Sequence, residues 1–373
     1  MHFLCEEWLI DVATTYAGKC ILIAAAMTII ERSLFPDRPA FWVTAGRRGG
    51  GKTTALTMLI MATLGLRPAA AAWTPNEEER RKALLSYFMD GVPYILWDNV
   101  PRGITISCPH IERSCTAETY VDRKLGVSER VQASAATIHL FTGNNIGPKG
   151  DLASRSLQAR IEIDRTDPEN RPFRHCDPIG WTEANRVKIL RALYTVLLGN
   201  PELRQVRHAP AKTRFKLWWR VVGAAIENAA KLHSEAVEPA AHDAKDRSRP
   251  VSIDFQKLFL DQESDEEDSA SLADTLSVLN KRWPGGTFKA ADVAGVINEN
   301  GNTPDGVAIR EFLFPGQKSD VVSSKSVARR LLAHVGNPVR QDDKILSLYA
   351  GTDSNSKMKT FLVSVAMAEG VAA

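Results

Sequence analysis

One short stretch of the chain has the residue types and spacing to bind the phosphates of a nucleotide. It reads Gly46-Arg47-Arg48-Gly49-Gly50-Gly51-Lys52-Thr53 and fits the pattern G-x-x-x-x-G-K-[ST]. Glycines let successive backbone N–H groups turn toward a phosphate, and a following helix adds the positive end of its dipole. Lys52 would reach the β- and γ-phosphates, and the Thr53 hydroxyl would ligate Mg²⁺. The cradle around them would comprise Gly46, Gly49, Gly50, Gly51 and Thr54.

The elements around this stretch are those that the chemistry needs. Apolar residues 41–44 predict a strand that leads into the loop, and residues 53–64 predict a helix that Gly65 ends. A glycine-rich loop that matches the pattern by chance would not need either element. Further strands are predicted over residues 94–97, 137–142 and 160–164, each followed by a polar or glycine-containing loop. Residues 20–165 therefore predict an α/β sheet, which places ligands at the ends of its strands.

Two polar residues follow the predicted strands downstream of the loop. Asp98 ends an apolar strand and could hold Mg²⁺ through water. Asn144, with Asn145 in reserve, could place an amide on the attacking water or the γ-phosphate. The alternatives are an exposed aspartate at a strand end and an asparagine turn that serves only the backbone conformation.

An arginine that enters the phosphate site of a neighbouring subunit would stabilise the charge of a transition state. Arg155 and Arg160 are the candidates, and Arg155 is preferred. The alternative for either residue is a surface salt bridge, which contributes roughly 0–1 kcal/mol.

In this order, the motifs resemble those of an AAA+ ATPase of the superfamily 3 helicase type, in particular the replication ATPases of phages and integrated elements. The resemblance covers residues 20–200 and includes residues 115–126, which are similar to the family's DNA-contacting hairpin. It implies that Lys124, with Arg123 beside it, contacts single-stranded DNA in the pore of a ring. It also implies ATP and Mg²⁺ as cofactors, a hexamer as the expected ring, and a primase or initiator as a possible partner.

Two residues depart from the family pattern. Asn99 follows Asp98 where most AAA+ proteins have a second acid, so the general base is unassigned. Ser156 stands where many relatives have a second arginine, which is why Arg155 is the preferred finger.

The rest of the chain predicts three further regions after an ATPase core over residues 1–175. Residues 176–233 predict a helical lid in which Thr182 caps a helix over 183–198, and residues 234–270 predict a linker with an acidic run at 261–268. Residues 271–373 predict a winged-helix-like domain, with helices over 272–283, 288–297 and 324–335 and a hairpin of 345–349 and 360–365. Its expected DNA contacts are Lys325, Arg329, Arg330, Lys357 and Lys359. The alternative is a helical protein–protein module with a solvated charged face.

The composition sets broader limits. The 373 residues include 47 basic and 44 acidic residues, so a DNA-binding surface would have to be local. The five cysteines have no metal-binding spacing and predict reduced thiols in the cytoplasm. Apolar residues 21–30 are fewer than the ~20 residues that span a bilayer, so they predict a buried helix and no membrane association. Trp218 and Trp219 are expected in the core.

The sequence thus predicts an α/β P-loop NTPase domain with a helical lid and a winged-helix-like C-terminal domain. The expected function is an ATP-dependent, ring-forming DNA motor that acts in the replication of a phage or mobile element. The alternative is an initiator or loader that ATP switches with little turnover, as Asn99 suggests. A small-molecule kinase is a more distant third, because it would have no use for the asparagine, the arginine or the C-terminal module.

Overall fold

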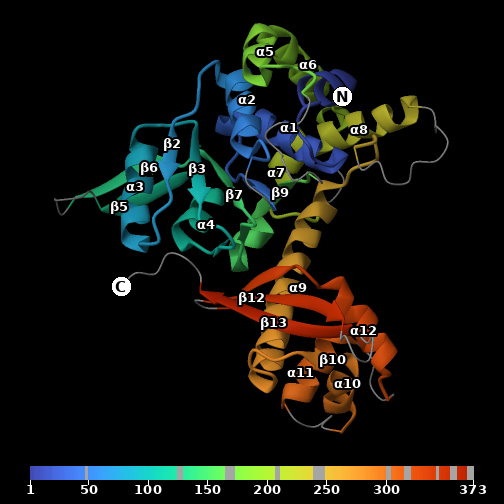
Figure 1. Cartoon of the computed structure of the whole chain (residues 1–373). Helices are drawn as coiled ribbons and strands as arrows, with labels where there is room; N and C mark the ends of the chain where they lie inside the picture. Colours follow the sequence, from blue (N-terminus) through green and yellow to red (C-terminus); the bar gives the residue numbers. More distant parts are fainter. Residues whose placement is uncertain are drawn as a thin grey trace. The chain divides into compact units, whose positions relative to one another are not determined.

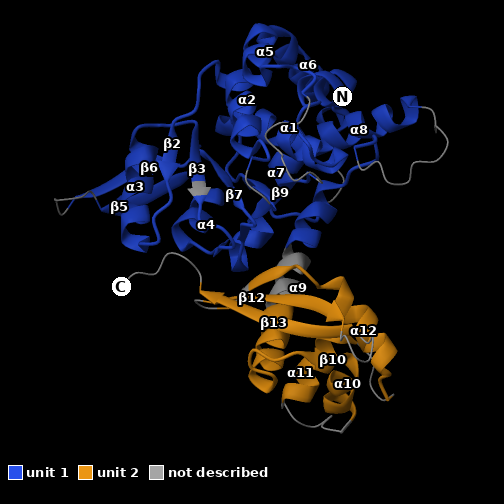
Figure 2. Ribbon diagram, viewed as in Figure 1, with its two compact units in different colours: residues 1–263 blue, residues 264–373 orange. Residues whose placement is uncertain are grey.

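The computed structural model describes residues 1–46, 49–123, 129–163, 173–205, 211–237, 248–299, 304–314, 321–341, 344–352 and 359–367. The chain forms two compact units, residues 1–263 and residues 264–373 (Figure 2). Each unit has a hydrophobic core of its own.

Unit 1 is a mixed α/β unit built on a five-stranded parallel sheet (Figure 1), as the sequence predicts. Its order is β2-β3-β7-β1-β9. The strands are β1 (Ala40–Ala45), β2 (Ala70–Ala72), β3 (Tyr94–Val100), β7 (Ile138–Asn144) and β9 (Ser156–Ile161). The fourth predicted strand, residues 160–164, was misplaced, because the strand begins at Ser156. The Ser156 hydroxyl accepts a hydrogen bond from Trp42 Nε1 at 2.9 Å and donates one to the Leu152 carbonyl at 2.7 Å, which fixes this start.

Helices cover both faces of the sheet. On one face, Phe41 and Val43 belong to the same buried cluster as the residues of α1 (Tyr16–Glu31), α2 (Lys52–Leu64), α6 (Arg186–Leu198) and α8 (Ala224–Ala236). On the other face, Trp42 lies in the cluster that contains residues of α3 (Glu77–Met89) and α4 (Pro109–Cys115). Successive residues of a strand point to opposite faces, so a strand covered on both sides is apolar throughout.

The region after the sheet differs in detail from the predicted lid. Residues 183–198 do not form one helix, because α5 (Pro178–Ala184) and α6 are separate. The cap is Asp177, whose side chain accepts the Gly180 N–H, whereas the Thr182 hydroxyl donates to the Pro178 carbonyl inside α5. Trp218 and Trp219 are buried, as expected. Short helical turns complete this part of the unit: η1 (Leu4–Trp8), η2 (Arg32–Leu34), η4 (Pro201–Arg204), α7 (Lys216–Trp218) and η5 (Trp219–Gly223).

Two small sheets lie beside the main one. The strands β5 (Thr119–Arg123) and β6 (Arg130–Ser134) pair antiparallel, while β4 (Thr105–Ile106) and β8 (Gly147–Pro148) pair parallel. The 3₁₀ helix η3 (Gly150–Arg155) joins β8 to β9.

Unit 2 contains a four-stranded sheet in the order β10-β13-β12-β11. Its strands are β10 (Phe288–Lys289), β11 (Pro338–Gln341), β12 (Lys344–Thr352) and β13 (Lys359–Met367). Its helices are α10 (Ala290–Glu299), α11 (Pro304–Leu313) and α12 (Ser324–Ala333), with the C-terminal part of α9 (Phe255–Arg282). Val327 and Leu331 of α12 are buried in the core of this unit, and Leu332 packs against it.

The region predicted as a linker, residues 234–270, is helical from Phe255 onward. Helix α9 continues through the acidic run at 261–268. In the described part of the chain, no helix is long and apolar enough to cross a membrane.

Candidate functional site

The glycine-rich stretch connects the end of β1 to the start of α2. Gly49 and Gly51 have φ angles of 75° and 84°, in the left-handed region that favours glycine, and Gly51 is the N-cap of α2. Lys52 begins the helix, and Thr54 lies half-buried in its first turn. Arg47 and Arg48 lie outside the described residues. Gly49 and Gly51 therefore adopt backbone conformations that a residue with a Cβ rarely adopts.

Four predicted site residues converge at the carboxyl edge of the sheet. Strand β7 lies next to β1, with Asn144 opposite Ala45, and Lys52 Nζ donates a hydrogen bond to Asn144 Oδ1 at 2.8 Å. On the other side of β7, β3 brings Asp98 to the helix, and the Thr53 hydroxyl donates to Asp98 Oδ1 at 3.4 Å. The lysine, threonine, aspartate and asparagine thus form two contacting pairs at one sheet edge.

The turn after β7 positions Asn144. A Cβ on Gly143 would lie 2.8 Å from the Val100 carbonyl oxygen, so only glycine fits there. Asn145 has a φ of 49°, and its N–H donates to the Ala45 carbonyl at 3.0 Å. The sequence interpretation missed Thr44, whose buried hydroxyl accepts the Ile146 N–H at 3.2 Å and contacts the Gly143 carbonyl at 3.3 Å. Thr44 is the single polar residue of the otherwise apolar strand β1, and this pattern could have indicated a role for its hydroxyl.

The electrostatics of the site centre on Lys52. Burial lowers the pKa of its amine, and the nearby Asp98 charge acts in the opposite direction. A half-buried cation beside a neutral amide favours an anionic ligand, because such a ligand would restore the charge balance.

Thr53 and Asp98 are the residues here that could hold a magnesium ion. One hydroxyl and one carboxylate are the oxygen ligands that Mg²⁺ takes when phosphate and water supply the rest. Within the described residues, no group of three or more His, Cys, Asp or Glu side chains could hold a metal without such help.

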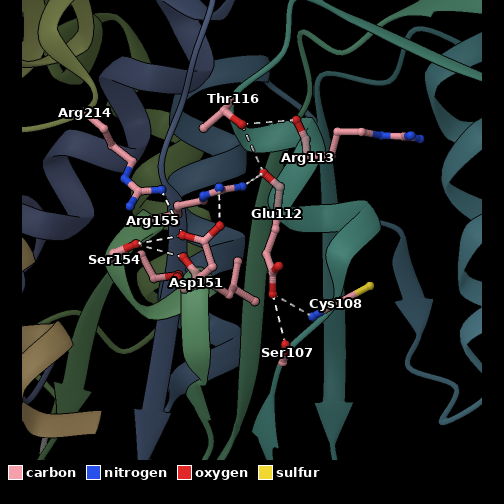
Figure 3. A network of polar contacts seen from close by, with 11 residues as sticks. Ser107, Cys108, Glu112, Arg113, Thr116, Asp151, Ser154, Arg155 and Arg214 are labelled. Carbon is pink, nitrogen blue, oxygen red and sulfur yellow. Dashed lines mark hydrogen bonds and ion pairs between the residues drawn. The ribbon is translucent and has the colours of Figure 1, made fainter. Parts of the chain in front are cut away.

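Arg155 lies at the N-terminal ends of the strands, whereas the glycine-rich loop lies at their C-terminal ends. Ser156 pairs with Ala40, at the start of β1, whereas the loop follows Ala45, roughly 16 Å farther along the strand. The Arg155 guanidinium donates to the Glu112 carbonyl and forms an ion pair with Asp151 (Figure 3). Its side chain is 15% exposed, while Arg160 is exposed on β9. A role of Arg155 in a neighbouring subunit stays a prediction and requires it to leave these partners.

Of residues 115–126, which were predicted as the DNA-contacting hairpin, 119–123 form β5, which pairs with β6 farther along the chain. Arg123 is exposed at the end of β5, and Lys124 lies outside the described residues. Arg130 stands directly opposite Arg123 and is also exposed, which the sequence interpretation missed. Two like charges in such a pair destabilise a hairpin unless an anion lies nearby.

The basic residues expected on α12 have two different environments. Lys325 and Arg329 are exposed and lie one turn apart. The Arg330 guanidinium instead lies over the ring of Phe314, 4.7 Å from its centroid, so part of its role is structural. Lys359 is exposed at the start of β13, and Lys357 lies outside the described residues.

No protein-family model and no curated protein sequence matches this chain.

Proposed function

We propose that this chain is an ATP-dependent, ring-forming DNA motor, a helicase or translocase, that acts in the replication of a phage or mobile element. One observation carries the proposal: Lys52 contacts Asn144, and Thr53 contacts Asp98. Both contacts lie at the end of the sheet where the glycine-rich loop leads from β1 into α2. Chance resemblance of the loop to a phosphate-binding sequence would not bring these four side chains together.

The chemistry proposed for the site assigns one task to each side chain. Lys52 would neutralise charge on the β- and γ-phosphates, and the Asn144 amide that now accepts its hydrogen bond would turn to the γ-phosphate or the attacking water. Thr53 and Asp98 would hold Mg²⁺, which bridges phosphate oxygens and neutralises developing charge. The backbone N–H groups from Gly46 to Thr54 would bind the phosphates.

The DNA contacts and the ring belong to the same proposal. Arg123 and Arg130 form a like-charged pair on the hairpin that would suit a phosphate backbone, and Lys124, which follows Arg123 in the sequence, is proposed as a further contact. The winged-helix-like unit 2 would contact duplex DNA through Lys325 and Arg329 of α12, with Arg330 partly engaged by Phe314. We place the protein in the cytoplasm as a hexamer that works with a primase or an initiator.

The second candidate is an initiator or loader that binds ATP to assemble on DNA and hydrolyses it slowly. The observation that favours it is Asn99, since an amide after Asp98 cannot accept a proton as a carboxylate does.

Lys52→Ala tests both candidates, with Lys188→Ala, an exposed lysine on α6, as the matched control. If the protein is a motor, single-stranded DNA stimulates ATP hydrolysis, and Lys52→Ala lowers the rate by at least about 100-fold, since it removes a charge that stabilises the transition state. Specific activity should also fall on dilution, because the ring dissociates.

The other outcomes separate the alternatives. Tight ATP binding with negligible turnover on any DNA supports the switch. A wild-type protein that neither binds ATP in calorimetry nor hydrolyses it would exclude both.

A further inference from the structure

Helix α4 connects the sheet to the hairpin β5–β6. The chain leaves α4 at Cys115 and enters β5 at Thr119, and the Arg113 guanidinium of α4 lies 4.3 Å from the ring centroid of Tyr120 in β5. A helix of seven residues is too short to be stable alone, so its position depends on its contacts. Whatever holds α4 therefore also holds the base of the hairpin.

Buried contacts fix the C-terminal half of α4 to β7 and to the segment that precedes β1. The buried Arg38 guanidinium donates to the Ala117 carbonyl at 2.7 Å, just beyond the helix. His139 of β7 contacts the Ser114 hydroxyl at 2.8 Å. Both partners are buried, so these contacts give α4 a fixed attachment to the sheet.

A further attachment is the Arg155 network (Figure 3), in which the Asp151 side chain is 49% exposed. Arg155 donates to the Glu112 carbonyl in the middle of α4 and to the Asp151 carboxylate. Asp151 also accepts a hydrogen bond from Arg214 Nη1 at 3.0 Å, so one carboxylate holds two arginines from different parts of the chain. Such charge-assisted contacts to a half-exposed carboxylate can be made and broken more easily than the buried ones.

The same network is joined to the candidate catalytic asparagine. Residues 144–155 form one continuous crossover that starts at Asn144 and ends at Arg155. Along the way this crossover pairs with the segment before α4: Gly103 N–H donates to the Asn144 carbonyl at 3.0 Å, and Lys149 N–H donates to the Ile106 carbonyl at 2.7 Å. A shift of Asn144 toward a phosphate would therefore displace the segment that holds α4.

We propose that Arg155 acts within its own subunit as a positioning residue, which, together with Asp151 and Arg214, couples the position of Asn144 to helix α4 and the β5–β6 hairpin. This inference rests on the proposed function, because it assigns the network the task of transmitting the nucleotide state to the DNA-contacting hairpin. It gives Arg155 a role different from that of a finger in a neighbouring site.

Asp151→Asn tests the coupling, because it removes the charge that both arginines share and keeps the size of the side chain. The affinity for single-stranded DNA is measured by fluorescence anisotropy with a slowly hydrolysed ATP analogue and with ADP. We expect the ratio of the two affinities to fall about tenfold toward one. ATP affinity and DNA-independent hydrolysis should change less than about twofold, as for other surface substitutions. Asp151→Glu, which keeps the charge, should retain most of the ratio.

The matched control is Asp90→Asn, an exposed aspartate at the end of α3. It should leave the affinity ratio unchanged. A wild-type ratio in Asp151→Asn, or faster DNA-stimulated hydrolysis because Arg155 is freed to act in trans, would overturn the proposal.

Mixed subunits give a second test of the two roles of Arg155. In a ring, Lys52→Ala subunits supply an intact Arg155 to Arg155→Ala subunits, whose own glycine-rich loops are intact. The activity measured is DNA-stimulated hydrolysis, which the proposal expects Arg155→Ala subunits to lose. Its restoration by mixing the two variants would establish a finger in trans and overturn the proposal. We expect no restoration.

Hydrogen exchange separates failure of this inference from failure of the proposed function. Without any nucleotide, amides of residues 109–123 should exchange about tenfold faster in Asp151→Asn than in the wild type or Asp90→Asn. Unchanged exchange would show that Asp151 does not hold α4, whatever the protein does with ATP. Faster exchange in a protein that does not bind ATP would support the attachment of α4 through Asp151. It would also reject the motor and the coupling of Asn144 to the hairpin.

Discussion

At the residue scale, the candidate site depends on a turn that admits little variation. Asn144 can accept the Lys52 hydrogen bond only because Gly143 brings the end of β7 against the Val100 carbonyl and Asn145 adopts a left-handed conformation. Thr44 then joins the turn to β1 through its hydroxyl. Thus the backbone around Asn144 is as specific a requirement as the amide itself.

We expect Gly143→Ala to lower the free energy of unfolding by about 1–3 kcal/mol, since the added methyl group would overlap the Val100 carbonyl and the Ile146 side chain. The matched control is Gly147→Ala four residues later, where a Cβ would meet only Gln158 Oε1 at 4.0 Å and should change stability by less than about 0.5 kcal/mol. Urea denaturation measures both. Equal stability of the two variants would contradict the steric argument.

At the element scale, α4 is fixed to the sheet by a chain of polar contacts through the buried ring of His139. Trp97 Nε1 can only donate, so His139 Nδ1 accepts its hydrogen bond at 3.3 Å and the proton of the neutral ring lies on Nε2. Nε2 then donates to the Ser114 hydroxyl, which in turn donates to the Ile111 carbonyl at 2.7 Å. Protonation of Nδ1 would place two donors against each other and break this chain.

This arrangement predicts a specific loss of stability in mild acid. Burial lowers the pKa of His139 from 6.5 to about 3, and the Arg38 charge acts in the same direction. Above pH 6.5 the ring is neutral in both the folded and the unfolded chain. Below pH 6.5 only the unfolded chain takes up the proton, so His139 lowers the free energy of unfolding by about 1.4 kcal/mol per pH unit until the folded ring titrates near pH 3.

Urea denaturation between pH 7.5 and 5 measures this slope. His139→Gln should reduce the slope below pH 6.5 by about 1.4 kcal/mol per pH unit, even if the variant is less stable than the wild type at every pH. Phe141→Leu, a destabilising change in the same strand without a titratable group, should keep the wild-type slope. The same slope in His139→Gln and the wild type would contradict the assignment, because other histidines with lowered pKa, such as His110 and His233, remain in both proteins.

At the scale of the whole molecule, two separate cores indicate two units that can unfold independently. Phe255 and Phe259 of α9 pack in the core of unit 1, whereas Leu276 and Leu279 of the same helix pack in the core of unit 2. The acidic residues between them lie in the part of α9 that connects the two cores. A nucleotide bound by unit 1 should therefore stabilise that unit directly.

Scanning calorimetry should show two transitions. Leu331→Ala removes a buried side chain of α12 and should destabilise the unit 2 transition by about 2–5 kcal/mol while leaving the other in place. Leu56→Ala in α2 should have the opposite selectivity, and ATP with Mg²⁺ should raise only the transition that Leu56→Ala lowers. One transition that responds to both substitutions would show that the units unfold together.

Many of the expected elements could be predicted because their signals are local. Residues 41–44 and 94–97 are apolar strands covered on both faces, and both were found within one to three residues of the observed β1 and β3. Strand β2 was missed because its three alanines carry no strand pattern. The break between α5 and α6 was missed because two residues could cap a helix here. Asp177 is the N-cap of α5, and Thr182, which was predicted as the cap, lies inside that helix.

The sequence alone determined the glycine-rich loop, the strand ends that carry Asp98 and Asn144, and the boundaries of α2, α10 and α12 to within two residues. Each depends on residues close together in the chain, whose spacing limits the backbone. Only the tertiary structure decided the partners of Arg155, because Glu112 and Asp151 meet it through a helix and a crossover whose packing no local pattern encodes. It also decided that Ser156 is buried against Trp42, a place where an arginine would have no room.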